Sequence, residues 1–223
     1  MTSFPGSPRL LKGAIVGLDK FSPLSSVIVF QYNPDTMSRS LSPRMLRSAS
    51  NSDNVSSPKE AMRITGPPKE TITLKVEIDA TDQLEVADPI AVKSGIHPQL
   101  AALELLMYPK MATVLTNRVL SKTGMLEVVP MEMPLALLVW GLQRTLPVRL
   151  ESLSIDEQAF DASLNPIRAE ASLSLQVLSY ADLPFNSKGG GLFAAHQVQK
   201  EILATATSAL SAVSQVTGGV LPI

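Results

Sequence analysis

Strict alternation of apolar and polar side chains marks residues 70–79 as the clearest element of the chain. Ile72, Leu74, Val76 and Ile78 alternate with polar residues, which predicts a strand with one buried face, as in an antiparallel sheet or a barrel wall. Runs rich in β-branched and apolar residues predict further strands at 27–32, 125–129, 135–140, 149–155 and 168–180. In the last of these, the outward Ser172 and Ser174 are uncharged, which suits a sheet that meets another protein.

Helical spacing appears in two places. Leu100, Leu103, Leu106 and Met107 form one stripe, which predicts a short helix that begins at Pro98 and ends before Pro109. A second helix is predicted over residues 193–216, where small apolar residues recur every three or four positions. The seam includes Val198, Ile202, Ala209 and Val213, and it fits core packing and docking onto a different subunit equally well.

Loop signals divide the chain into three parts. Residues 38–58 contain eight serines and two prolines, so we expect 38–63 to be a flexible loop or a long hairpin. It is either a solvated linker or a segment that orders on a neighbouring subunit. We expect an N-terminal arm at 1–24, a β domain at 25–185, and a flexible linker with a C-terminal helix and tail at 186–223. The predicted fold is α+β, mainly antiparallel β, with one short helix, a long mobile loop and a C-terminal helix.

Composition narrows the class of function. Hydrophobic residues make up 45% of the chain and charged residues 17%, with a net charge of −1, so no overall field favours nucleic acid or acidic lipid. The low charge suggests a partner or an oligomer. The absence of cysteine excludes disulfides, thiol catalysis and thiolate zinc sites. The N-terminal residues do not match a secretory signal and no apolar run reaches bilayer length, so a cytoplasmic location without a membrane span is expected.

Residues with catalytic or metal-binding chemistry do not form a recognisable motif. His97 and His196 are the two histidines, and neither has a partner at ligand spacing. Asp79 and Asp82 follow the alternating strand, and we interpret them as turn-capping residues rather than as a calcium or acid–base site. We therefore expect no enzymatic activity, no metal and no cofactor. A hydrolase that uses Asp79 and Asp82 is kept as an alternative.

Four short motifs occur in order over residues 25–185. Their residues are Phe30, Tyr32, Asn33 and Pro34; Asp79 and Thr81; Trp140 and Gly141; and Phe160, Asp161, Pro166, Arg168 and Ala169. In this pattern the chain resembles the tube-protein domain of contractile injection systems, which are phage-tail-like particles. The family turn usually carries a glycine before its proline, where this chain has Asn165, a residue that tolerates left-handed backbone. The LysM module of many relatives is not present in this sequence.

The resemblance implies a tube-protein-like β-barrel or sandwich and a structural role. The chain would be a tube initiator or baseplate hub component that forms a six-fold ring with copies of itself. Its other partners would be the inner tube protein and the spike, hub and baseplate proteins, within a particle assembled in the cytoplasm. The predicted interface residues are Arg39, Arg44, Arg47, Val198, Ile202, Ala209 and Val213.

Side-chain roles and a rival function complete the expectations. We assign Phe160, Trp140 and Tyr32 to core packing, and we expect Arg168 to pair with Asp161 across the hairpin. The rival is a monomeric β-barrel that holds a small ligand or peptide in its interior.

Overall fold

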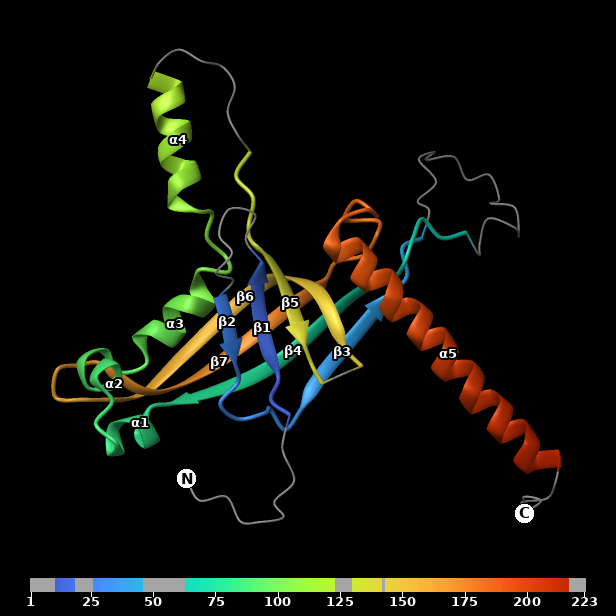
Figure 1. Cartoon of the computed structure of the whole chain (residues 1–223), viewed down its shortest axis with the longest axis horizontal. Coiled ribbons are helices and arrows are strands. Elements are labelled where there is room, and N and C mark those ends of the chain that lie inside the picture. Colours follow the sequence, from blue (N-terminus) through green and yellow to red (C-terminus); the bar gives the residue numbers. More distant parts are fainter. Residues whose placement is uncertain (1–10, 19–25, 46–62, 123–129, 142, 217–223) are drawn as a thin grey trace, which may run out of the picture.

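One antiparallel sheet and five helices make up the part of the chain that the structure describes. The computed structural model describes residues 11–18, 26–45, 63–122, 130–141 and 143–216. The seven strands are β1 (Ala14–Leu18), β2 (Ser26–Val29), β3 (Met37–Ser42), β4 (Lys69–Asp79), β5 (Leu135–Val139), β6 (Thr145–Phe160) and β7 (Pro166–Val177). Their order across the sheet is β2-β1-β5-β6-β7-β4-β3 (Figure 1). The fold is thus α+β and mainly antiparallel β, as predicted.

The buried core lies on one face of the sheet, here called the inner face. On β4, Ile72, Leu74 and Val76 are almost fully buried, whereas Thr73 and Lys75 between them are exposed. The alternation predicted for this strand is therefore confirmed. Neighbouring strands add the same period-two sets of buried residues, namely Ile15, Leu138, Leu146, Val148, Leu150, Ala169, Ala171, Leu173, Leu175 and Val177.

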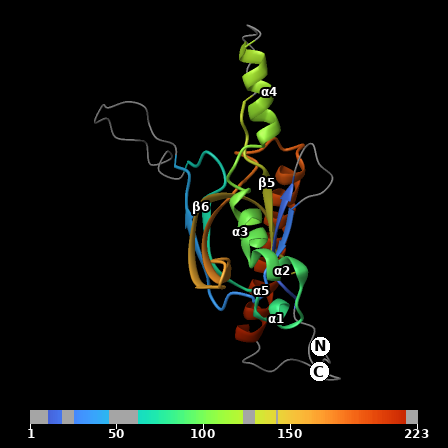
Figure 2. The ribbon, with the colours of Figure 1, turned by 90° about the vertical axis from the view of Figure 1, so that its left-hand side faces the viewer.

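Four helices follow β4 and a fifth follows β7. They are α1 (Thr81–Glu85), α2 (Pro89–Ser94), α3 (His97–Glu104), α4 (Met111–Lys122) and α5 (Lys188–Val216). The sheet is strongly curved, and α3 lies between its two arms (Figure 2). Leu100 and Leu103 of α3 are buried in the same core as the inner face, which confirms the predicted helical stripe. His97 is the first residue of α3, as expected for a boundary residue.

Two strands and three helices were not predicted. Residues 14–18 form β1, although an N-terminal arm was expected there, and residues 37–42 form β3, where the loop or hairpin was expected to begin. Both strands are short and depend on the neighbours that they pair with. β3 and β4 are antiparallel partners and the Met45–Ile64 bridge continues their pairing, whereas the choice between a flexible loop and a hairpin for the residues between them stays a prediction. Residues 46–62 lie outside the described residues, as does the strand predicted at 125–129.

The additional helices α1, α2 and α4 surround the single short helix that was expected. The start of α2 has a clear local cause, because the Asp88 carboxylate accepts hydrogen bonds from the backbone N–H groups of Ile90 at 2.9 Å and Ala91 at 3.1 Å. Pro89 occupies the first helical position. A backbone N–H has no partner within the helix at this position, so the missing N–H of proline costs no hydrogen bond. An Asp-Pro pair of this kind is a helix-start signal.

The C-terminal helix was predicted, but it begins five residues earlier than expected. The glycines at 189–191 were expected in a flexible linker, and they form the first turn of α5 instead. Ser187 precedes the helix and its hydroxyl accepts a hydrogen bond from the backbone N–H of Gly190 at 3.1 Å. This side chain satisfies a backbone donor that the first turn leaves free.

The helices differ in how closely they approach the sheet. The first turns of α5 pack against β6, and its far half extends away from the body, as does α4 (Figure 1). Among the described helices, none combines the length and the apolar character needed to cross a lipid bilayer.

Candidate assembly interface

The sheet ends on both sides in short strands. Within the described residues, β2 pairs only with β1 and β3 pairs only with β4. Val27 and Val29 on β2 are 59% and 54% exposed, and Leu41 on β3 is 51% exposed. Edge strands present backbone N–H and C=O groups to which another strand can pair. The two edges are therefore the first candidate contact surfaces.

The outer face of the sheet, opposite the core, has an apolar part on β2, β1 and β5. The register places apolar side chains on this face in all three strands. All are half-buried or exposed, and they are Ala14, Val16, Leu18, Val27, Val29, Leu135, Leu137 and Val139. This apolar part continues to the β2 edge. That edge therefore combines an apolar surface with a strand that has no partner on its outer side among the described residues.

The remaining outer face, on β6, β7, β4 and β3, is rich in hydroxyl groups. The register aligns Ser152, Ser174, Thr73 and Ser38 in one row across the four strands. Charged side chains flank this row, in the pairs Lys75–Glu170 at 2.6 Å and Lys69–Glu151 at 3.2 Å. Ser172 and Ser174 do lie on the face opposite the core, as predicted, and their contact with another protein stays a prediction.

Ion pairs within the chain occupy two of the predicted interface arginines. The Arg39 guanidinium contacts the Glu70 carboxylate at 2.6 Å, and Lys200 of α5 approaches the other oxygen of Glu70 at 3.5 Å. Glu70 is only 3% exposed, and a buried carboxylate needs such partners. This cluster joins β3, β4 and α5.

The second pair fixes the beginning of the segment after β3. Arg44 contacts the Asp182 carboxylate at 2.6 Å, and Asp182 also accepts hydrogen bonds from the backbone N–H and hydroxyl of Ser179. Burial disfavours ionisation of Asp182, but the Arg44 and Ser179 hydrogen bonds outweigh it and hold its pKa below the usual value. Arg47 lies outside the described residues, and the interface role of all three arginines stays a prediction.

The seam predicted on the C-terminal helix does not belong to the core over its described part. Val198 and Ile202 are 53% and 62% exposed. Phe193, nearer the start of α5, is buried and packs edge-on against Tyr180 at 5.8 Å between ring centroids. The helix is therefore anchored at its start, and Val198 and Ile202 do not pack in the core; their docking onto a different subunit stays a prediction. Ala209 and Val213 lie in α5, but their side chains are outside the described residues.

Residues of the first and third motifs meet at one end of the sheet. Phe30 is buried and its ring lies 6.4 Å from that of Trp140, which is half-buried. A side chain at Gly13 would collide with both rings, since its Cβ would lie 2.8 Å from Phe30 and 2.9 Å from Trp140. Asn33 fixes this end, because its side chain accepts a hydrogen bond from Gly13 N–H and donates one to the Leu11 carbonyl, both at 2.9 Å.

The core assignment holds for one of the three aromatic residues. Trp140 packs against the core, but Tyr32 and Phe160 are 50% and 49% exposed, so the core prediction for these two is wrong. Phe160 ends β6, and residues 156–160 at this end of the strand are all exposed. Gly141 has a φ of 70° and lies in the β5–β6 turn.

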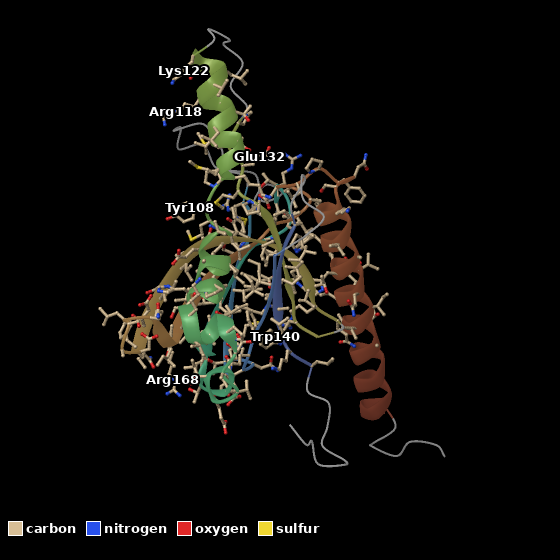
Figure 3. The ribbon with its side chains drawn as sticks, turned by 60° about the vertical axis from the view of Figure 1, so that its left-hand side comes forward. Tyr108, Arg118, Lys122, Glu132, Trp140 and Arg168 are labelled. Carbon is tan, nitrogen blue, oxygen red and sulfur yellow. The ribbon has the colours of Figure 1, made fainter. Side chains whose placement is uncertain are left out.

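Arg168 pairs with Asp79, so the predicted pairing with Asp161 is wrong. The register sets Asp79 of β4 directly opposite Arg168 of β7, and the guanidinium reaches one carboxylate oxygen at 2.5 and 2.8 Å. The other oxygen accepts hydrogen bonds from the backbone N–H and hydroxyl of Thr81, which confirms the turn-capping role. Arg168 lies at the end of the sheet that carries α1 and α2 (Figure 3).

These contacts determine the ionisation of Asp79. Burial disfavours the charged form, but the hydrogen bonds from Thr81 and the Arg168 guanidinium outweigh it and lower the pKa of Asp79. The Gln31 side-chain carbonyl accepts a hydrogen bond from the backbone N–H of Asp79 at 3.0 Å. With both oxygens engaged in structural contacts, Asp79 is poorly placed to act as a general base, which weakens the hydrolase alternative.

Asp161 holds the β6–β7 turn instead of pairing with an arginine. One of its oxygens accepts hydrogen bonds from the backbone N–H groups of Ser163 at 2.7 Å and Asn165 at 2.8 Å, and the other accepts from the Asn165 side chain at 2.9 Å. The left-handed residue of the turn is Leu164, with a φ of 65°. Asn165 supports the turn through its amide rather than through left-handed backbone, contrary to expectation.

A cavity of about 610 Å³ opens between β3, the segment before β4, and α5. Its walls are largely apolar and include Leu41, Ile64, Pro67, Tyr180 and Phe193, with Glu70 and Lys200 at its polar side. No sequence motif predicts this cavity, because it joins three segments that are far apart along the chain.

Comparison with known proteins adds no relative to this picture. No protein-family model matches the chain, and no curated protein matches it. The resemblance to tube proteins therefore rests on the four residue motifs.

Proposed function

We propose that the chain is a structural component of a contractile injection system. It forms a ring that joins the spike and baseplate hub to the inner tube. The observation that carries this proposal is the seven-stranded antiparallel sheet with two short edge strands and exposed apolar side chains on both. The four motifs shared with tube proteins agree with it, and the proposed fold is a tube-protein-like barrel or sandwich.

Assembly would use the two edges together. In the ring, β2 of one copy and β3 of the next pair through their backbone groups, which extends the sheet from one copy to its neighbour. When the same contact between two different surfaces is repeated from copy to copy, the copies form a closed ring if the rotation between neighbours divides a full turn. We propose a ring of six copies. Pairing would also cover the apolar side chains Val27, Val29 and Leu41, which water contacts in the isolated chain.

Surfaces outside the edges would meet the other partners. The row of hydroxyl side chains across the outer face is uncharged, and such a row can approach a second protein without burying unpaired charge. The exposed part of α5, with Val198 and Ile202, offers apolar anchors beyond the body of the chain. We assign these two surfaces to the tube and hub proteins.

A monomeric ligand- or peptide-binding module is the second candidate. Among the described residues, buried side chains fill the centre of the inner face, so nothing there supports a ligand in the interior. The apolar cavity beside β3 and α5, with its volume of about 610 Å³, is instead the observation that favours this candidate.

Lysine substitutions on the β2 edge test the proposal. Val27→Lys and Val29→Lys place charge on an edge strand, and both side chains are more than half exposed, so the monomer should fold while ring formation is lost. Val92→Lys on α2 is the matched control, because Val92 is 55% exposed and lies away from the sheet edges. Light scattering and electron microscopy measure ring formation, for the chain alone and after co-expression with tube and hub proteins.

The outcomes separate the two candidates. Rings that form with the wild type and Val92→Lys but not with the β2 variants support the proposal. A wild-type chain that remains monomeric alone and with its co-expressed partners contradicts it and favours the ligand-binding module.

A further inference from the structure

A second cavity, of about 350 Å³, lies between α5 and the β5–β6 turn beside β3. In contrast to the apolar cavity, it is lined mainly by polar and positively charged side chains. They are Arg39, Gln143, Arg144, His196, Gln199 and Lys200, with Trp140 and Leu203 beside them. None of the sequence motifs includes this set of residues as a unit.

His196 is one of the lining residues of this cavity, and both of its ring nitrogens lack a hydrogen-bond partner among the described residues. The two nitrogens are also shielded from solvent. Ring nitrogens that are shielded from solvent and lack partners are unfavourable and call for a group that supplies them. Burial first, and then the nearby Lys200, lower the pKa of His196; Arg144 and Arg39 act in the same direction and Glu70 opposes them.

The charges around the cavity are unbalanced. Arg39, Arg144 and Lys200 line it, and Glu70, which lines the neighbouring apolar cavity, neutralises one of these three charges. The side-chain contact of Arg144 is with the Met37 sulfur at 3.7 Å. The structure pairs it with no carboxylate among the described residues. Guanidinium and buried imidazole donors with excess positive charge favour an oxyanion.

We propose that this cavity binds a small oxyanion, of the phosphate or carboxylate class, between Arg144 and His196. The guanidinium donates two parallel hydrogen bonds to two oxygens of the ligand, and the imidazole, once its side chain turns toward the cavity, donates one to another oxygen. Gln143 and Gln199 also line this cavity, and their side-chain amides donate hydrogen bonds to the ligand oxygens that Arg144 and His196 do not bind. This site does not depend on ring assembly, so a monomeric chain would bind the ligand too.

Binding and protonation of His196 are coupled. An anion beside the ring favours the imidazolium form, so the ligand raises the pKa of His196 from its lowered starting value. By linkage, the anion binds more tightly at a pH below the pKa that His196 has in the anion-free protein than at a pH above it. A purely structural histidine would not couple its titration to added anion.

Proton NMR of the two histidine rings tests this proposal directly. The chain has only His97 and His196, and a His97→Gln variant identifies the His196 resonance. The probes are inorganic sulfate, a tetrahedral dianion, and acetate, a carboxylate, each compared with chloride at equal ionic strength. We expect sulfate or acetate to shift the His196 resonance with a dissociation constant of about 1 mM or below at pH 6 and to raise its titration midpoint. The more effective probe identifies the ligand class.

Arg144→Gln supplies the second measurement. It removes the guanidinium but keeps the backbone carbonyl of residue 144, which accepts a hydrogen bond from the backbone N–H of Trp140. The variant should weaken probe binding about tenfold or more. Arg118→Gln on α4 is the matched control, since Arg118 does not line the cavity, and it should bind as the wild type does. A His196 resonance that responds equally to chloride, sulfate and acetate overturns the proposal, as does undiminished probe binding by Arg144→Gln.

Discussion

At the residue scale, three aspartates hold the backbone where it changes direction. Asp79 caps the end of β4, Asp161 holds the β6–β7 turn, and Asp182 holds the turn after β7. Each accepts hydrogen bonds from nearby backbone N–H groups, and the pKa of each is lowered. For Asp161 the main cause is the pair of hydrogen bonds from Asn165. The folded structure therefore stabilises the charged form of these carboxylates.

The lowered pKa values predict loss of stability in acid. A carboxyl group with a folded pKa below its unfolded value of about 3.9 stabilises the fold fully above that pH, and the contribution disappears as pH falls through the folded pKa. Asp79→Asn removes one such group. We expect it to lower the free energy of unfolding by roughly 1 kcal/mol at pH 7 and to have a smaller effect near pH 2. Urea unfolding followed by circular dichroism at both pH values measures the difference.

Asp82→Asn is the control for this substitution. Asp82 lies three positions after Asp79 on the exposed surface of α1, and the variant should follow the wild-type pH profile closely. An Asp79→Asn variant that loses the same stability at pH 2 as at pH 7 would show that charge at this position is not what stabilises the turn.

The partner of Arg168 shows what the sequence can and cannot supply at this scale. Asp161 lies seven positions before Arg168 and across the same hairpin, which made it the expected partner. The true partner, Asp79, lies on β4 and is placed by the register of β4 on β7. That register depends on the whole inner face rather than on local sequence. The capping role of Asp79 was predictable because it depends only on Thr81, two residues away.

At the element scale, α5 begins where three glycines follow a tight turn. A Cβ at Gly190 would lie 2.5 Å from the Pro184 carbonyl oxygen and 3.1 Å from the Phe185 Cα, both backbone atoms. A Cβ at Gly191 would meet nothing within 4 Å. The adjacent glycines therefore have different reasons to be glycine. At 190 the backbone approaches too closely for a side chain, and at 191 no neighbour prevents one.

Alanine at these two positions gives opposite predictions. Gly190→Ala forces the helix away from the 184–185 turn and should lower the free energy of unfolding by about 1–3 kcal/mol. Gly191→Ala only removes backbone freedom within a helix and should raise it by about 0.5–1 kcal/mol. Thermal and urea unfolding of both variants provide the test. Equal effects from the two substitutions would contradict the close packing of α5 on its preceding turn.

Local pattern predicted the long elements and missed those held by neighbours. β4 and β7 alternate strictly over many residues, so their position and inward face were predictable. β1 has five residues and β3 six, and β3 is polar outside Met37 and Leu41. Such segments become strands because a paired neighbour satisfies their backbone groups. The start of α5 was missed because glycine runs indicate flexibility unless tertiary contacts fix them.

At the scale of the whole molecule, the apolar and polar surfaces have a consistent arrangement. Core side chains fill the inner face, the outer face divides into an apolar and a hydroxyl-rich part, and the apolar part reaches the β2 edge. The sequence signal for this arrangement was its low charge and high apolar content, which predicted a partner without locating it. The edges and the two cavities could not be located from sequence, because each needs segments brought together by the fold.

Engineered cysteines can test whether β2 of one copy meets β3 of the next. The natural chain contains no cysteine, so any disulfide must come from the introduced residues. Val27→Cys marks the β2 edge and Ser40→Cys marks the β3 edge, and both positions are exposed. In a head-to-tail ring each single variant should remain uncross-linked under mild oxidation, because its thiols lie far apart. The double variant should give a ladder of covalent oligomers on a gel run without reducing agent, and the ladder should end at the number of copies in the ring.

Val92→Cys combined with Ser40→Cys is the matched control and should give no ladder. Dimers from Val27→Cys alone would instead indicate a two-fold contact between β2 strands, which closes at two copies and excludes a tube-like ring through these edges.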